Sequence, residues 1–220
     1  MTVAVVILRD RATYAQQCVS ALHRAGLDIV VFDHGSTWPP ALDWLDSCGL
    51  PVARSGNAHP RDVWESGRLA PYVGSERFVL TDPDVIAPDT DWLPRLHDLL
   101  DRYPTRVKAG LALRLDDLPG CNRDTVKVRA WEHQWWQTEV EPGVYDALVD
   151  TTLALYRPLS ELPRTFLLGP ALRLADVHSA RHLTWYEDTI NPGEEITYYR
   201  THVTPGVSHW ADPDLYMGVK

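Results

Sequence analysis

The feature that most constrains the fold of this chain is a regular alternation of short apolar runs and amphipathic stretches. Residues 3–8 form a continuous, valine-rich run, which is typical of a strand buried on both faces. Residues 13–25 carry apolar side chains at helical spacing, and Gly26 stands where such a helix usually ends. Residues 27–32 then repeat the strand pattern. This order predicts parallel strands joined by a crossover helix.

The same alternation continues through the first half of the chain. It predicts helices over residues 41–48, 61–69 and 92–102, and strands over residues 51–54, 77–81 and 107–113. Strands and helices that alternate in this way indicate an α/β protein, a three-layer, Rossmann-like fold with a mostly parallel central sheet. Ligands of such sheets bind outside the carboxyl ends of the strands.

The second half is less regular. A helix is expected over residues 128–138, two strand-like runs lie at 151–156 and 171–174, and a last helix begins near Gly193. Neither a repeat nor a linker is evident, so we expect one domain over residues 1–220. Within it, the regular part ends at about residue 115 and residues 116–220 form the less regular part.

The helix expected over residues 128–138 carries Trp131, Trp135 and Trp136. Their spacing favours one apolar face packed on the core. Stacking of a tryptophan on a ligand ring is the alternative.

Composition excludes several classes of protein. The formal net charge of -9 disfavours a partner bound through a broad phosphate backbone. Three scattered cysteines indicate neither a disulfide framework nor a zinc site. The sequence lacks an apolar run of the ~18 residues that a membrane span needs, and lacks a secretory leader pattern. We therefore expect a cytoplasmic protein without a transmembrane segment.

The strongest chemical signal is Asp82-Pro83-Asp84, which directly follows the apolar strand expected over residues 77–81. Two carboxylates at alternate positions on a proline-stiffened turn place hard oxygen ligands where a ligand cleft is expected. A diphosphate with bound Mg²⁺ or Mn²⁺ needs such a group, because the cation offsets charge on the leaving diphosphate. The other interpretation is a plain turn.

Residues 1 to about 115 resemble the nucleotide-binding half of GT-A glycosyltransferases, especially those of family 2. That family has an Asp-x-Gly-Ser turn after its second strand, which matches Asp33-His34-Gly35-Ser36. A segment with Asn and Arg follows its third strand, matched loosely by residues 57–61, and its Asp-x-Asp element matches residues 82–84. The chain departs from the family at residues 8–11, where Leu-Arg-Asp-Arg replaces a segment resembling Pro-Thr-Tyr-Asn, so the base that is read stays open.

The resemblance implies a role for each matched residue. Asp33 would contact the base or ribose of a nucleotide-sugar donor, with a UDP-sugar favoured, and Asp82 would lie near the ribose and the metal. Asp84 would be the metal ligand. The remaining donor-binding candidates are Ser36, Asn57 and Arg61.

Two further motifs near the C-terminus complete the predicted site. Glu194 and Glu195 resemble the Glu-Asp pair that supplies the base in inverting family 2 enzymes, although Glu stands in place of Asp. Acidic residues also favour the start of a helix, which is the competing explanation. His209 stands where several GT-A enzymes place a histidine that completes the metal shell, and a structural histidine is the alternative.

The sequence thus predicts a metal-dependent glycosyltransferase, a transferase of hexosyl or related groups that inverts with a carboxylate base. Residues 1 to about 115 are expected to bind the nucleotide sugar, and residues 116–220 are expected to shape the site of an acceptor that carries a hydroxyl group. A glycan or small molecule is favoured, and modified DNA and protein stay open. The competing functions are a sugar-phosphate nucleotidyltransferase, whose glycine-rich loop is lacking at residues 8–11, and a non-catalytic module that binds a nucleotide sugar or carbohydrate.

Overall fold

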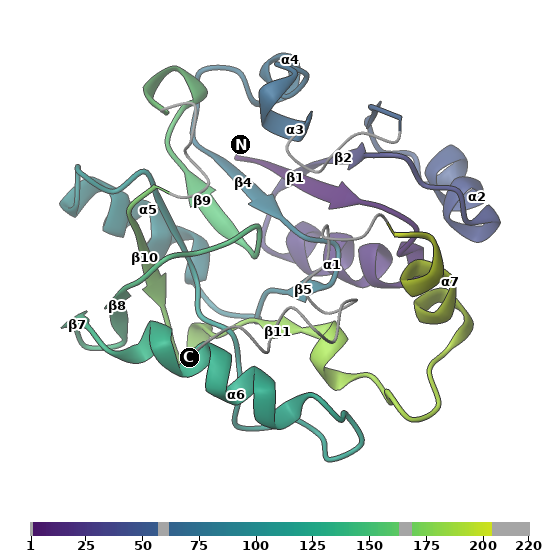
Figure 1. The fold of residues 1–220 in the computed structure, drawn as a ribbon. Helices are drawn as coiled ribbons and strands as arrows, with labels where there is room; N and C mark the ends of the chain where they lie inside the picture. The colour runs from purple at the N-terminus through teal and green to yellow at the C-terminus, as the bar shows by residue number, and fades with distance from the viewer. Residues whose placement is uncertain (1, 57–61, 163–168, 204–220) are drawn as a thin grey trace.

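The protein is built on one large sheet (Figure 1). The computed structural model describes residues 2–56, 62–162 and 169–203. From one edge to the other, the strands are β3 (Val52–Arg54), β2 (Asp28–Asp33), β1 (Val3–Leu8), β4 (Phe78–Thr81), β9 (Ala154–Tyr156), β6 (Lys108–Leu111), β10 (Ala171–Leu174), β8 (Val144–Asp146) and β7 (Glu139–Glu141). The pairings make β9 and β8 antiparallel to the other seven strands. The predicted mostly parallel α/β sheet is confirmed.

Helices cover both faces of this sheet. The longer ones, α1 (Ala12–Arg24), α5 (Trp92–Arg102) and α6 (Thr125–His133), share one apolar core. The short helices α3 (Asp62–Glu65) and α4 (Ala70–Val73) pack on the other face. At the β3 edge, α2 (Pro39–Ser47) packs beside α1.

Strand β1 shows why both faces must be covered. Ala4 and Val6 belong to the core that contains α1 and α5, whereas Val5 and Ile7 belong to the core that contains α3 and α4. Successive side chains of a strand point to opposite faces, so a run of apolar residues without alternation needs a partner layer on each side. The predicted three layers follow from this.

Element boundaries differ from the expectations where glycine or tertiary contacts intervene. Of the helix expected over residues 61–69, the structure forms only α3, and a separate helix, α4, begins at residue 70, because Gly67 between them has a left-handed φ of 71°. The tryptophan-bearing helix begins at Thr125 and ends in the 3-10 turn η1 (Gln134–Trp136). The sequence pattern missed the hairpin of β7 and β8, whose strands have three residues each.

A second, two-stranded sheet lies at the carboxyl end of β4. It pairs β5 (Val85–Ile86) with β11 (Arg181–His182) in antiparallel fashion. Its register places His182 opposite Val85, and the amide of Leu183 donates to the carbonyl of Asp84 at 2.7 Å. This small sheet brings a segment from the second half of the chain against the Asp-Pro-Asp turn.

No helix within the described residues is long and apolar enough to cross a membrane.

Candidate active site

The carboxyl ends of β2, β1 and β4 lie side by side and carry three polar loops. The loop after β1 holds Arg9, Asp10 and Arg11, and the loop after β4 holds Asp82 and Asp84. The third loop follows β2. Because the three strands are parallel neighbours, all three loops meet at one edge of the sheet.

The turn after β2 is held by its own polar residues. Asp33 is buried, and its Oδ1 accepts the amide of Ser36 at 3.0 Å. The Ser36 hydroxyl oxygen accepts the amide of Asp10 at 2.9 Å. The donor-binding candidates Asp33 and Ser36 are therefore adjacent, and both take part in building the turn.

Asp10 has the left-handed φ of 55°, which is uncommon for a residue other than glycine. Its buried carboxylate accepts the amides of Thr37 and Trp38, at 2.5 and 2.7 Å, just before α2 begins. Backbone strain of this kind persists where surrounding contacts hold it, and it is frequent at binding sites. Asp10 thus ties the β1 loop to the β2 turn.

Asp82 directly follows β4 and pairs with Thr151, in the segment that leads into β9. Its Oδ2 accepts the hydroxyl of Thr151 at 2.7 Å, and its amide donates to the carbonyl of Thr151. Burial and the negative charge of Asp84 raise the pKa of Asp82 well above its ordinary value. The negative charge at Asp82 is therefore poorly compensated by its surroundings.

Asp84 lies at the centre of a buried polar cluster. It is 2% exposed, and its Oδ2 accepts Nη1 of Arg11 at 2.8 Å and the hydroxyl of Thr184. The same oxygen lies 3.5 Å from Nδ1 of His182, whose ring stacks on Trp185. Burial acts to raise the pKa of Asp84, but these charged and hydrogen-bonding neighbours outweigh it and hold the pKa below its ordinary value.

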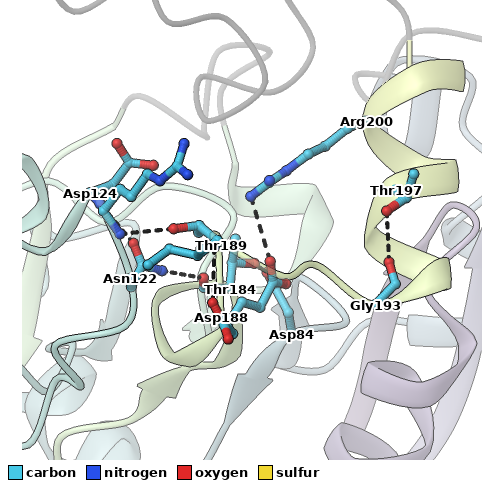
Figure 2. Close-up of polar contacts among 12 residues, drawn as sticks. Asp84, Asn122, Asp124, Thr184, Asp188, Thr189, Gly193, Thr197 and Arg200 are labelled. Carbon is cyan, nitrogen blue, oxygen red and sulfur yellow. Dashed lines mark hydrogen bonds and ion pairs between the residues drawn. The ribbon is translucent and has the colours of Figure 1, made fainter.

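Arg11 joins a second buried carboxylate, Glu187, to the cluster. Its Nη2 lies 3.3 Å from Oε1 of Glu187, which also accepts the hydroxyl of Tyr14 at 2.6 Å. From the other side, Nη2 of Arg200 lies 3.6 Å from Oε2 of Glu187. Burial raises the pKa of Glu187. Figure 2 shows Arg200 extending from α7 (Glu194–His202) toward the acidic side chains around Asp84.

Asp188 follows Glu187 but is exposed. Its carboxylate accepts the amides of Ile190 and Asn191, and these bonds lower its pKa, so the group stays ionised at neutral pH. Glu187 and Asp188 are adjacent and form a Glu-Asp pair. The sequence motifs did not predict this pair as part of the site, and the base was assigned to residues 194 and 195 instead. The sequence signal for this pair is the Glu-Asp dipeptide itself, which directly follows Trp185 and Tyr186.

The segment that carries this pair is anchored to the start of α6. The side-chain amide of Asn122 donates to the carbonyl of Thr184 at 3.1 Å, and the amide of Arg123 donates to the Thr189 hydroxyl at 2.8 Å (Figure 2). Asn122 is buried and its Oδ1 accepts the amide of Asp124. These bonds fix the position of Glu187 and Asp188 relative to the sheet.

Glu194 and Glu195 begin α7, as predicted. Glu194 is exposed. Oε1 of Glu195 accepts the amide of Thr13, in the first turn of α1, at 2.8 Å, and burial raises its pKa. A carboxylate at this place stabilises the helix start, where amides lack partners and the helix dipole is positive. Glu195 thus holds α7 against α1.

Three predicted residues, Asn57, Arg61 and His209, lie outside the described residues. Within residues 2–56, 62–162 and 169–203, no group of three or more His, Cys, Asp or Glu side chains is arranged to hold a metal ion. Asp82 and Asp84 are thus the metal-ligand candidates that the structure locates. The three tryptophans of the α6 region are half-buried.

The comparisons with known proteins find likeness in fold alone. No family model and no curated protein match the chain. Among solved structures, TarS 1-349 of S. aureus aligns at 15% identity and a TM-score of 0.48, over 82% of this chain and 60% of that one. HddC from Yersinia pseudotuberculosis aligns at 9% identity and 0.49, over 90% and 97%. Glucosyl-3-phosphoglycerate synthase from Mycobacterium tuberculosis aligns at 18% and 0.47, over 82% and 71%.

The chain spans only part of some of these proteins, 36% of the longer TarS structure. One of the TarS 1-349 structures contains UDP, and one of the HddC structures contains GMP-PN.

The Arg11 and Asp84 pair generates a prediction about stability. Replacing Arg11 by Met leaves Asp84 and Glu187 buried without their shared cation, so we expect a loss of about 3–5 kcal/mol in the free energy of unfolding. Adding Asp84→Asn should recover part of this loss, with a coupling of about 1–3 kcal/mol in a double-mutant cycle. Urea denaturation of the four proteins measures both quantities.

The matched control is the exposed pair of Arg54 and Asp46, whose side chains are 47% and 72% exposed. Arg54→Met should cost no more than about 1 kcal/mol. A cost for Arg11→Met as small as this one, or the absence of coupling to Asp84→Asn, would contradict the role assigned to the buried pair.

Proposed function

We propose that this protein is a metal-dependent glycosyltransferase that moves a sugar from a nucleoside diphosphate to a hydroxyl group. The observation that carries the proposal is the position of Asp82 and Asp84 at the carboxyl end of β4, beside the turns that follow β1 and β2. In parallel α/β sheets this edge binds nucleotides. Asp33 and Ser36 would contact the nucleoside, and a UDP-sugar is the favoured donor.

The residues at this edge fit a divalent cation. Carboxylate oxygens are the ligands that Mg²⁺ and Mn²⁺ prefer. Asp82 accepts one hydroxyl, from Thr151, and burial and the negative charge of Asp84 raise its pKa, which a bound cation would offset. We propose that Asp82 and Asp84 hold the cation and that His209 completes its shell. When bound, the cation would offset the charge that develops on the leaving diphosphate.

The side chains around the cation would orient the donor. Arg11 keeps Asp84 ionised and in place. Asp10 fixes the β2 turn against the β1 loop, so Asp33 is held next to the expected position of the nucleoside. Preorganised groups of this kind raise the rate because they need no rearrangement during the reaction.

Two carboxylate pairs compete for the role of general base, Glu187 with Asp188 and Glu194 with Glu195. We propose Asp188, because it is exposed to an incoming acceptor and is ionised at neutral pH. It would take the proton of the acceptor hydroxyl while that oxygen attacks the anomeric carbon, which inverts its configuration. Glu187, bonded to Arg11 and Tyr14, would position Asp188, and Glu195 would hold α7 on α1.

Two alternative functions would use the same edge of the sheet. A sugar-phosphate nucleotidyltransferase needs a loop that cradles a triphosphate, and the β1 loop has no glycine at residues 9–11. A binding module would hold the nucleotide sugar without turning it over. Release of the nucleoside diphosphate from a bound donor discriminates the transferase from both.

The first test of the proposal is binding. In a thermal-shift panel of UDP, GDP, CMP and dTDP sugars, one nucleotide class should raise the melting temperature with Mn²⁺ and not with a chelator, because a ligand of the native state stabilises it. Asp82→Asn should abolish this metal-dependent shift. The surface variant Asp46→Asn should keep it. Equal shifts for wild type and Asp82→Asn would remove Asp82 from the metal site.

The second test separates binding from chemistry. Asp188→Asn should keep the calorimetric affinity for the donor with Mn²⁺ and slow release of the nucleoside diphosphate by about 10²–10⁴-fold, the usual contribution of a general base. Glu195→Gln retains a hydrogen-bond acceptor for Thr13 and should keep most of the rate. The exposed Asp43→Asn serves as control. A slow Glu195→Gln beside a fast Asp188→Asn would transfer the role to Glu195.

A further inference from the structure

A cavity lies away from Asp82 and Asp84, at the opposite, amino-terminal edge of the parallel strands. Its volume is about 290 Å³, and its wall includes Trp135 of η1, the end of β8 and the start of β10. The strand register places Asp146, at the end of β8, opposite Leu172 at the start of β10. The cavity therefore opens at the amino ends of β10 and β6.

The ring of Trp135 is held in a fixed orientation. The guanidinium of Arg173 lies over it, 5.3 Å from the ring centroid, and Trp131 meets it edge-on at 6.3 Å. Arg173 is itself held by buried Glu132 at 2.6 Å and by the carbonyl of Leu148 at 2.7 Å. A half-buried indole fixed from behind in this way forms a rigid wall for a ligand.

The polar part of the lining is dense but electrically balanced. Nη2 of Arg106 pairs with Asp146 at 2.6 Å, so these two charges cancel. Nε of Arg106 is buried and has no hydrogen-bond partner among the described residues, which is costly unless a ligand or water accepts from it. The other polar side chains of the wall are Gln134, Gln137 and Thr138, which offer both donors and acceptors.

We propose that this cavity is a binding subsite for a neutral sugar, a pyranose of a carbohydrate chain stacked on Trp135. The ring would lie on the indole while its hydroxyl groups bond the amides and Arg106. The paired charges of the wall give an anion no advantage. The volume, at the low end of the ~300–1,000 Å³ usual for ligand sites, is small for a nucleotide. The site is separate from the proposed transfer site and does not depend on it.

Ligand-observed saturation-transfer NMR tests this with the methyl glycosides of glucose, galactose, mannose and N-acetylglucosamine. At least one should receive saturation from the full chain, and Trp135→Leu should weaken its binding by about tenfold or more. Trp44→Leu, which removes another half-buried tryptophan, on α2, should leave it unchanged. The double variant Gln134→Ala with Gln137→Ala alters only exposed side chains and should also weaken binding, which keeps the test valid if Trp135→Leu does not fold.

Several outcomes would overturn the proposal. Saturation of none of the four glycosides at millimolar concentration would do so, as would binding that survives both the Trp135→Leu and the glutamine variants. Displacement of the bound sugar by UDP with Mn²⁺ would place it at the Asp82 edge instead. Inorganic phosphate that competes with the sugar would show an anion site.

Discussion

The ion pair between Arg11 and Asp84 is the interaction on which the rest of the site depends. A carboxylate that is 2% exposed needs a partner, because an isolated buried charge is very unfavourable. Arg11 meets this need, and its second terminal nitrogen reaches Glu187 and Thr184. One guanidinium thus holds together the loop after β1, the loop after β4 and the segment after β11. Their relative positions follow from it.

This arrangement determines where charge is left for a ligand. Arg11 is engaged with Asp84 and Glu187, so nearby groups balance a negative charge on Asp82 poorly, and burial together with the charge of Asp84 raises its pKa. On the other side, α7 closes the edge through Glu195 on the start of α1 and through Tyr198, whose hydroxyl lies 3.1 Å from that of Thr37. In the proposed function, a cation bound with a diphosphate would offset this unbalanced negative charge.

The sequence pattern predicted most of the sheet and its helices, because a helix or strand that buries one or both faces carries apolar residues at a recognisable spacing. Helix α5 has the boundaries predicted for it, residues 92–102, since its apolar positions at 92, 96, 99 and 100 form one stripe. The helix over residues 61–69 was wrong because Gly67 adopts a left-handed conformation that periodicity does not reveal. The strands β7 and β8 have three residues each, which is too short for a recognisable spacing of apolar residues.

The site was harder to predict, because its contacts join residues far apart in the chain. Asp82 and Asp84 were found from their place after an apolar strand. Arg11 was noted only as a departure from a family pattern, since its partners lie 73 and 176 positions away. Glu195 was singled out for chemistry, and its bond to Thr13 depends on how α7 docks. Local sequence carries little information about such contacts.

The central claim is that the carboxyl edge of β1, β2 and β4 binds a nucleoside diphosphate. Its most direct test is amide hydrogen exchange, measured with and without Mn²⁺ and the nucleotide that stabilises the protein in the thermal-shift panel. Bound ligand slows exchange of the amides it orders. We predict slower exchange in residues 9–11, 34–37 and 82–86, and no metal-dependent slowing at residues 134–138. Metal-dependent protection that left these three loops unchanged and appeared elsewhere would contradict it.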